Sequence, residues 1–220
     1  MELFKDRAFL PGVLQELVAQ LTIGPALMPP PTGKRLSLDE SDTGYHIDFG
    51  SQRVDIEQRA KDFEAENVVP FGEFIKTATD FGRRIMSHFE LLATRLAIVR
   101  NNLVLDLNEK DMGEIYKRLF KPTPFFENNP PYEWVWQGVA KLAIPDGEKP
   151  EEANLITKVV RSQGRIGDKP EVSLLRIEYD VNTLPTRTQP RFNGDSLAVM
   201  LPKLEEFQNQ IEADIMNVIS

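Results

Sequence analysis

Hydrophobic and polar residues alternate with a period of two between residues 45 and 57, where two short runs flank Gly50 and Ser51. Such alternation predicts half-buried strands, and a Gly-Ser pair between them predicts a tight β-hairpin. The alternation also assigns the residues to two faces. The apolar face carries Tyr45, Ile47, Phe49, Val54 and Ile56. The polar face carries His46, Asp48, Arg53, Asp55 and Glu57.

Three segments show the apolar spacing of three and four residues that is typical of amphipathic helices. The clearest one covers residues 70–89, where a proline suits the first turn. A shorter one covers residues 109–120, and Asn108 is in position to cap it. A long helix follows towards the end of the chain. It begins either at Ser196 or at Pro202.

The first part of the chain also repeats apolar residues at helical spacing. Residues 13–21 favour a short amphipathic helix, with a strand across residues 17–23 as the alternative. Met28 and three prolines after it then predict a stiff extended connector. We therefore expect a helical appendage and proline-rich connector over residues 1–31, and one α+β domain over residues 32–220.

The remaining apolar runs predict strands separated by loops. Residues 133–144 are apolar on both faces, which predicts a central strand, whereas the proline-rich residues 121–131 predict a loop. Two further runs form a hairpin, so that paired strands precede a long helix twice. The expected fold is α+β, with an antiparallel, meandering sheet packed against two long amphipathic helices. The strands are expected at 92–105, 133–144, 153–161 and 172–180.

Composition narrows the class of protein. The chain has 220 residues, of which 41% are hydrophobic and 27% charged, as in ordinary soluble proteins. It has no cysteine, which excludes disulfides, zinc thiolate sites and cysteine nucleophiles. No apolar run is long enough to span a bilayer, and the first residues do not resemble a signal peptide, so we expect a cytoplasmic protein without a membrane partner. The net charge of −8 disfavours nucleic acid as a direct ligand.

The polar face of the 45–57 hairpin is the best cluster of chemically able side chains in the sequence. A two-residue turn would place Asp48 opposite Arg53, and His46 opposite Asp55. Together with Glu57, one imidazole and three carboxylates are a set that a divalent cation or acid–base chemistry can use. Ordinary cross-strand pairs on a solvated face explain the same residues more simply, and we favour that interpretation.

Five aromatic residues follow one another closely in the second half of the chain. Both tryptophans are two residues apart, so on a strand they share a face. They are either anchors of a core or of a buried subunit interface, which we favour, or the lining of a ligand pocket. The five residues are Phe125, Phe126, Tyr132, Trp134 and Trp136.

Other candidate motifs are weak. His88 lies at the end of its helix, where it can interact with the helix dipole. Residues 164–169 contain two glycines and two basic residues, but no helix follows them, so they predict a hairpin tip rather than a phosphate loop. The chain has no nucleophile elbow, zinc-protease motif or dinucleotide-binding fingerprint, and we expect no cofactor.

The order of the elements resembles a sporadically distributed prokaryotic family of unknown function. The resemblance rests on residues 53–57 before the Pro70 helix, on 96–102, on 175–180 and on the final helix. It implies no catalytic residues. Because such genes are patchily distributed, as phage-defence genes often are, it implies an accessory component of a defence system.

Three hypotheses for the function follow. The first is a non-enzymatic protein-interaction or regulatory subunit that binds a protein partner or a second copy of itself. The second is a small-ligand sensor with an apolar cavity between the sheet and the final helix, lined by Trp134 and Trp136. The third is a metal-dependent hydrolase that uses His46, Asp48, Asp55 and Glu57. Because no catalytic motif is present, we favour the first.

Overall fold

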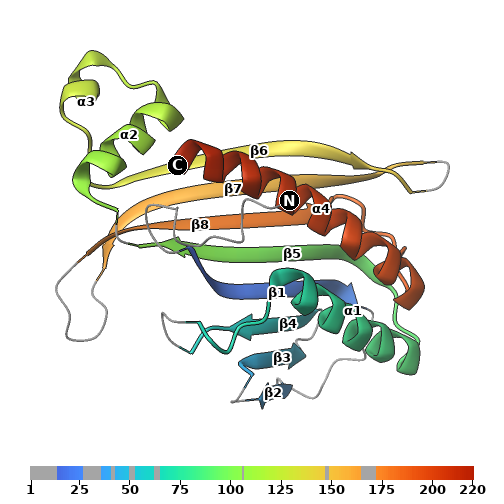
Figure 1. Cartoon of the computed structure of the whole chain (residues 1–220). Coiled ribbons are helices and arrows are strands. Elements are labelled where there is room, and N and C mark those ends of the chain that lie inside the picture. The colour runs from blue at the N-terminus through green and yellow to red at the C-terminus, as the bar shows by residue number, and fades with distance from the viewer. Residues whose placement is uncertain are drawn as a thin grey trace.

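Two long helices, α1 and α4, lie side by side on one face of an antiparallel sheet (Figure 1). The computed structural model describes residues 14–26, 36–40, 43–49, 53–61, 65–105, 107–146, 149–164 and 172–220. The strands are β1 (Leu14–Ala26), β2 (Leu36–Glu40), β3 (Tyr45–Phe49), β4 (Val54–Arg59), β5 (Ala93–Val104), β6 (Trp134–Ile144), β7 (Glu151–Gly164) and β8 (Val172–Thr183). The helices are α1 (Phe71–His88), α2 (Glu109–Phe120), α3 (Pro124–Asn128) and α4 (Gly194–Ile219). The predicted α+β class is confirmed.

The strand order of the eight-stranded sheet is β2-β3-β4-β1-β5-β8-β7-β6. The two halves of the sheet have the same order when each is followed outward from the centre. Each begins with its first strand, β1 or β5, and continues with three strands in reverse sequence order, β4-β3-β2 or β8-β7-β6. The central strands β1 and β5 pair antiparallel, with Gln20 opposite Val99. Each half thus has four strands followed by a long helix. The twofold succession of paired strands and helix in the sequence reflects this repeated topology.

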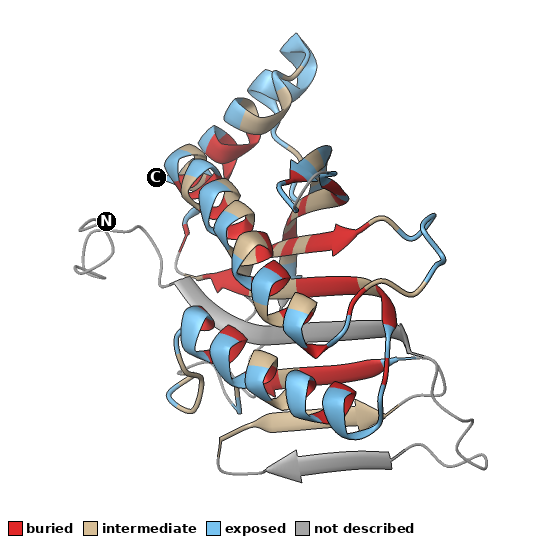
Figure 2. Cartoon of the chain, turned by 90° about the vertical axis from the view of Figure 1, so that its right-hand side faces the viewer, coloured by how far each residue is buried: buried red, intermediate tan, exposed pale blue. Residues whose placement is uncertain are grey.

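The apolar face of the β3–β4 hairpin packs under α1, as the alternation predicts. Val54 and Ile56 are each 1% exposed, and the Tyr45 and Phe74 rings stack with centroids 6.0 Å apart. The buried sides of both long helices face the sheet (Figure 2). Burial of a side chain such as Phe74 contributes about 2–3 kcal/mol, which is why α1 forms despite two glycines. The buried side chains of α1 include Phe71, Phe74, Ile75, Ala78, Ile85 and Met86.

A second core cluster lies between α2, the last turns of α4 and strands β6–β8. It holds Trp134 against the buried side of α2. In α2, Asn108 accepts hydrogen bonds from the backbone N–H groups of Lys110 and Asp111, and Asp111 accepts one from Asn108 N–H. The predicted cap is therefore confirmed, in the form of a reciprocal capping box.

The predicted helix over residues 13–21 is wrong, since residues 14–26 form the central strand β1. β1 is hydrogen-bonded to β4 on one side and to β5 on the other. Long-range pairing on both edges outweighs a short apolar period, which is only a weak local signal. Residues 14–26 therefore belong to the sheet and not to a helical appendage. The proline-rich connector over 28–31 lies outside the described residues.

Three other expectations also need correction. β6 is an edge strand rather than a central one, since β7 is its one neighbour in the sheet order. Its pattern misled because Val135 and Val139, which are 53% and 60% exposed, lie on the sheet face away from α4. The predicted 121–131 loop contains the short helix α3. The final helix begins at Gly194 behind an Asn193 cap, so Pro202 lies inside it.

Candidate interaction site

Helices α2 and α3 project beyond one end of the sheet (Figure 1). We call residues 109–133 the arm. The strand β5 leads into the arm and the strand β6 leads out of it. Its position at the end of two strands leaves α3 clear of both long helices.

A buried arginine fixes the base of the arm. Arg161 Nη2 donates to both carboxylate oxygens of Glu109, at 2.8 and 2.7 Å, and Nη1 donates to the Pro131 carbonyl at 3.1 Å. Ser173 Oγ donates to the same Glu109 carboxylate at 3.1 Å. The hydrogen bond from Arg161 holds the pKa of the Glu109 carboxyl below its usual range, and that from Ser173 adds to the effect. A bidentate pair of this kind fixes orientation as well as distance.

Aromatic packing fixes the arm from the other side. The Tyr116 and Phe120 rings of α2 stack with centroids 4.8 Å apart, and Trp134 meets Phe120 edge-on at 5.5 Å. Trp134 is only 7% exposed. The indole is therefore a core anchor that joins the arm to β6. A core position for the aromatic run holds for Trp134 but not for Phe125, Phe126 and Tyr132, which are exposed.

The far end of the arm carries two exposed aromatic rings, which we call the tip: Phe125 and Phe126. Their exposed fractions are 68% and 43%, and they meet edge to face at 5.3 Å. Tyr132, also on the arm, is 65% exposed. Single exposed apolar residues are ordinary on protein surfaces, but adjacent exposed aromatics on a projection are typical of interaction sites.

The tip is held in a defined conformation. The side-chain amides of Asn128 and Asn129 donate to the carbonyls of Pro124 and Phe125 at 2.9 and 3.0 Å, which ties the end of α3 to its first two residues. Pro124 lies in the first turn of α3, and four prolines of the segment restrict the backbone further. The sequence indicated this feature only through its prolines and asparagines. Exposure of the two rings could not be read from the pattern.

Trp136, the other half of the predicted ligand-binding pair, shares the helix side of β6 with Trp134. It is partly buried against the second core cluster, and its ring lies over Gly138, where an added Cβ would be 3.0 Å from the indole. A ligand site formed by Trp134 and Trp136 stays a prediction.

The polar residues of the β3–β4 hairpin share one sheet face, as predicted, but the predicted pairs are wrong. Asp48 lies opposite Asp55, and His46 lies opposite Glu57, so neither Arg53 nor Asp55 takes its expected place. Four residues rather than two separate the last paired positions of the two strands. The register therefore moves by two, which keeps each side chain on its face but changes its neighbour.

Ion pairs on this face run along the strands. His46 Nε2 lies 3.5 Å from Asp48 Oδ2, and Arg53 Nε lies 2.7 Å from Asp55 Oδ2. Within the described part of the chain, no group of three or more histidine, aspartate or glutamate side chains is arranged to hold a metal ion. The hydrolase based on His46, Asp48, Asp55 and Glu57 stays a prediction, which loss of activity in Asp55→Ala would support.

Two minor candidates have different outcomes. His88 closes α1, and its ring meets Phe89 edge-on at 4.7 Å, which agrees with a position at the helix end. Most of the glycine-rich segment 164–169 lies outside the described residues.

Sequence patterns missed a polar network beneath α4. On the buried side of α4, Gln208 and Glu212 lie between the apolar Leu204 and Ile215, at 0% and 7% exposure. Glu212 accepts from Arg100 Nη1 at 2.6 Å and from Asn102 Nδ2 at 2.8 Å. These polar groups join α4 to β5. The sequence pattern of α4 alone does not predict that they are buried. We interpret this network as structural.

Comparison with protein-family models, with curated proteins and with solved structures found no match. The family resemblance seen in the sequence therefore stays a prediction. No helix in the described part of the chain is long and apolar enough to cross a membrane.

Proposed function

We propose that this chain is a non-enzymatic protein-interaction subunit that docks a protein through the tip of its arm. One observation carries the proposal: Phe125 and Phe126 are 68% and 43% exposed, side by side, on a braced projection. Exposure of two large apolar rings to water is unfavourable, and a protein partner would remove that cost.

The physical character of the tip favours a protein partner. Aromatic rings supply large contact area with few rotatable bonds, and they are enriched at the centres of protein interfaces. Because Arg161, the Asn128 and Asn129 hydrogen bonds and the prolines fix the backbone before binding, little conformational entropy is lost on docking. The net charge of −8 argues against a phosphate backbone as the ligand.

The family resemblance supports a further part of the proposal, namely a cytoplasmic accessory component of a prokaryotic defence system. Copurification from the host with a nuclease or an ATPase would support this part. Its failure would leave the docking role of the tip unchanged, because that role rests on the exposed rings alone.

Photo-crosslinking tests the docking role directly. Phe126 is replaced by the photoreactive analogue benzoylphenylalanine, which preserves the aromatic ring, and Val139 is replaced in a matched control. Val139 is 60% exposed but lies on the sheet, away from the tip. After illumination in host cells, we expect a discrete protein adduct from position 126 and none from position 139. Equal or absent adducts at the two positions would overturn the proposal.

A further inference from the structure

A pocket of about 370 Å³ lies where the end of α1 meets the start of α4. We call it the socket. Met86, Leu91 and Leu92 form its apolar part, and the charged side chains that line it, Glu90 and Asp195, are both acidic. Phe89, beside Glu90 in the chain, is 58% exposed, and Leu92 is 42% exposed. Ser87 and Asn193 also line the socket, so its lining is partly apolar and partly polar, and its charged side chains are acidic.

The residues around the socket are held in place by backbone and side-chain contacts between α1 and α4. Leu91 N–H donates to the Met86 carbonyl at 2.8 Å, which fixes the turn after α1. Gly194 packs so closely on α1 that an added Cβ would be 3.2 Å from the Arg83 carbonyl oxygen. Arg83 Nη2 also lies 3.1 Å from Asp195 Oδ1, so that an ion pair joins the two helices across this contact.

We propose that the socket receives the tip of a second copy of this chain, so that copies associate head to tail. The proposal rests on the docking role of the tip proposed above and names the partner. The tip is convex and apolar, and the concave socket offers the apolar side chain of Leu92, which is 42% exposed, among polar neighbours. The socket volume lies at the lower end of the range of about 300–1,000 Å³ that is usual for ligand pockets, and it exceeds the volume of one phenyl ring such as that of Phe125 or Phe126.

Charge complementarity favours a second copy as the occupant. The segment 117–128, which carries the tip, has three basic residues, Lys117, Arg118 and Lys121, and one acidic residue, Glu127. Lys117 is partly neutralised by Glu114 at 3.0 Å, whereas Lys121 lies immediately before the proline-rich approach to the tip. Because Asp195 is already paired with Arg83, Lys121 would meet Glu90 at the socket, in a chain whose net charge otherwise opposes self-association.

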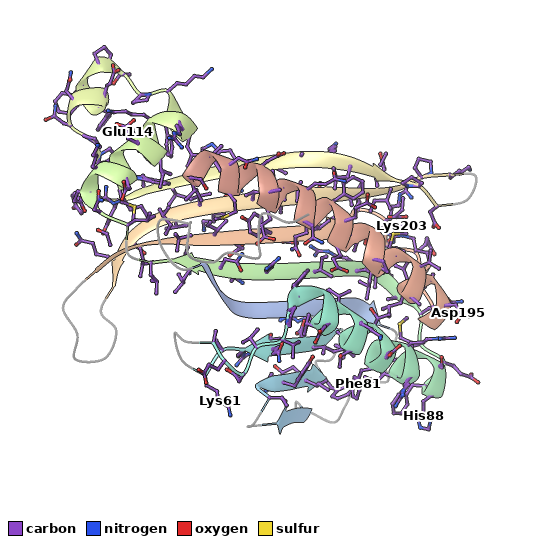
Figure 3. All side chains as sticks on the ribbon, in the orientation of Figure 1. Lys61, Phe81, His88, Glu114, Asp195 and Lys203 are labelled. Carbon is purple, nitrogen blue, oxygen red and sulfur yellow. The ribbon has the colours of Figure 1, made fainter. Side chains whose placement is uncertain are left out.

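The positions of tip and socket require two copies. Figure 3 shows Glu114 on the arm at one end of the molecule, and His88 and Asp195 at the opposite end. A chain therefore cannot fill its own socket. The contact joins two different surfaces and leaves one free tip and one free socket on every open assembly, so it extends into a filament or closes into a ring.

Mixing two defective variants tests this arrangement by sedimentation velocity. One variant, Phe125→Ser with Phe126→Ser, keeps only the socket; the other, Glu90→Lys with Leu92→Arg, keeps only the tip. We expect the wild-type chain and a Val139→Thr control to associate with rising concentration, and each variant alone to remain monomeric. The mixture should form a dimer and nothing larger, because it contains one functional pair.

The result that overturns the proposal is a mixture without dimer while the wild type associates, since the copies would then meet through other surfaces. A monomeric wild type whose position 126 crosslinks to a different protein would overturn self-association and keep the docking role. A monomeric wild type without any adduct would remove both. If a double variant fails to fold, charge reversal replaces it: Lys121→Glu should weaken association about tenfold, and Glu90→Lys should restore it.

Discussion

Arg161 and Glu109 join the sheet to the arm through two hydrogen bonds of 2.8 and 2.7 Å from one guanidinium nitrogen. The two partners differ in environment, since the Arg161 side chain is 1% exposed and the Glu109 side chain 73%. The buried cation depends on a carboxylate at the surface. Loss of that carboxylate leaves a charge in the interior, whereas loss of the arginine leaves a solvated glutamate.

The Glu109→Gln variant should lower the stability of the arm at neutral pH, by about 1 kcal/mol, because solvent screens a pair with one exposed partner. The pKa of Glu109 lies below its usual value of 4.5 in the folded chain. Its contribution is therefore complete above pH 4.5 and is lost as the pH falls through the lowered pKa. Hydrogen exchange of α2 amides at several pH values measures it.

The Glu114→Gln variant is the matched control, since Glu114 pairs only at the surface with Lys117. It should change exchange little at any pH. An arm of wild-type stability in Glu109→Gln at pH 7 would contradict the role of the buried arginine.

Loss of Glu212 from the network under α4 and loss of the nearby Tyr179 hydroxyl should affect stability unequally. Glu212→Ala removes the acceptor of Arg100 and Asn102, so we expect a loss of about 3 kcal/mol in the free energy of unfolding. Burial raises the pKa of Tyr179 far above its usual value, and its hydroxyl has no hydrogen-bond partner among the described residues. Tyr179→Phe should therefore cost nothing, or stabilise by up to about 1 kcal/mol. Urea denaturation measures both, and equal losses would contradict this account.

Glu205→Gln should stabilise the chain at neutral pH. Burial beside the first turn of α1 raises the pKa of Glu205, and a hydrogen bond from Asn209 and the charge of Arg100 offset this only in part. The folded carboxyl keeps its proton to a higher pH than the unfolded one. The contribution of the protonated Glu205 carboxyl to the stability of the fold is therefore complete below pH 4.5, and it is lost as the pH rises through the raised pKa.

The gain at pH 7 should be under about 1 kcal/mol, because the side chain is partly solvated. Thermal unfolding at pH 4 and pH 7 measures it, with the exposed neighbour Glu206→Gln as the control. Equal effects of the two substitutions at both pH values would contradict the assignment.

The same substitution at two glycines should have opposite effects. Gly44 has a φ of +71°, and an added Cβ would clash with the Arg59 carbonyl oxygen, which also accepts a hydrogen bond from Asn67 Nδ2. Gly44→Ala should cost about 1–3 kcal/mol or more. In α2, a Cβ at Gly113 would meet Pro130 at an ordinary 3.5 Å, so Gly113→Ala should stabilise by about 0.5–1 kcal/mol. The thermal unfolding midpoints of the two variants measure these effects. A shift of the same sign in both variants would contradict the different surroundings of the two glycines.

The sequence by itself determined the elements whose cause is local. The alternation of residues 45–57 fixed which side chains of the hairpin face the helices, and the stripe from Phe71 to Met86 fixed α1. Asn108 fixed the start of α2 through a capping box that involves only adjacent residues. In each case the signal is local. The period of the pattern predicts which side chains are buried, and a cap three residues away predicts where a helix begins.

Only the tertiary structure decided the rest. β1 is a strand because β4 and β5, distant in the chain, supply hydrogen bonds on both of its edges. Glu212 is buried because Arg100 and Asn102 lie beneath it, and Phe125 is exposed because α3 projects beyond the sheet. A local pattern predicts which side chains must be buried or must find hydrogen-bonding partners. Whether distant segments provide them depends on the path of the whole chain, and it is this path that leaves the tip and the socket at opposite ends.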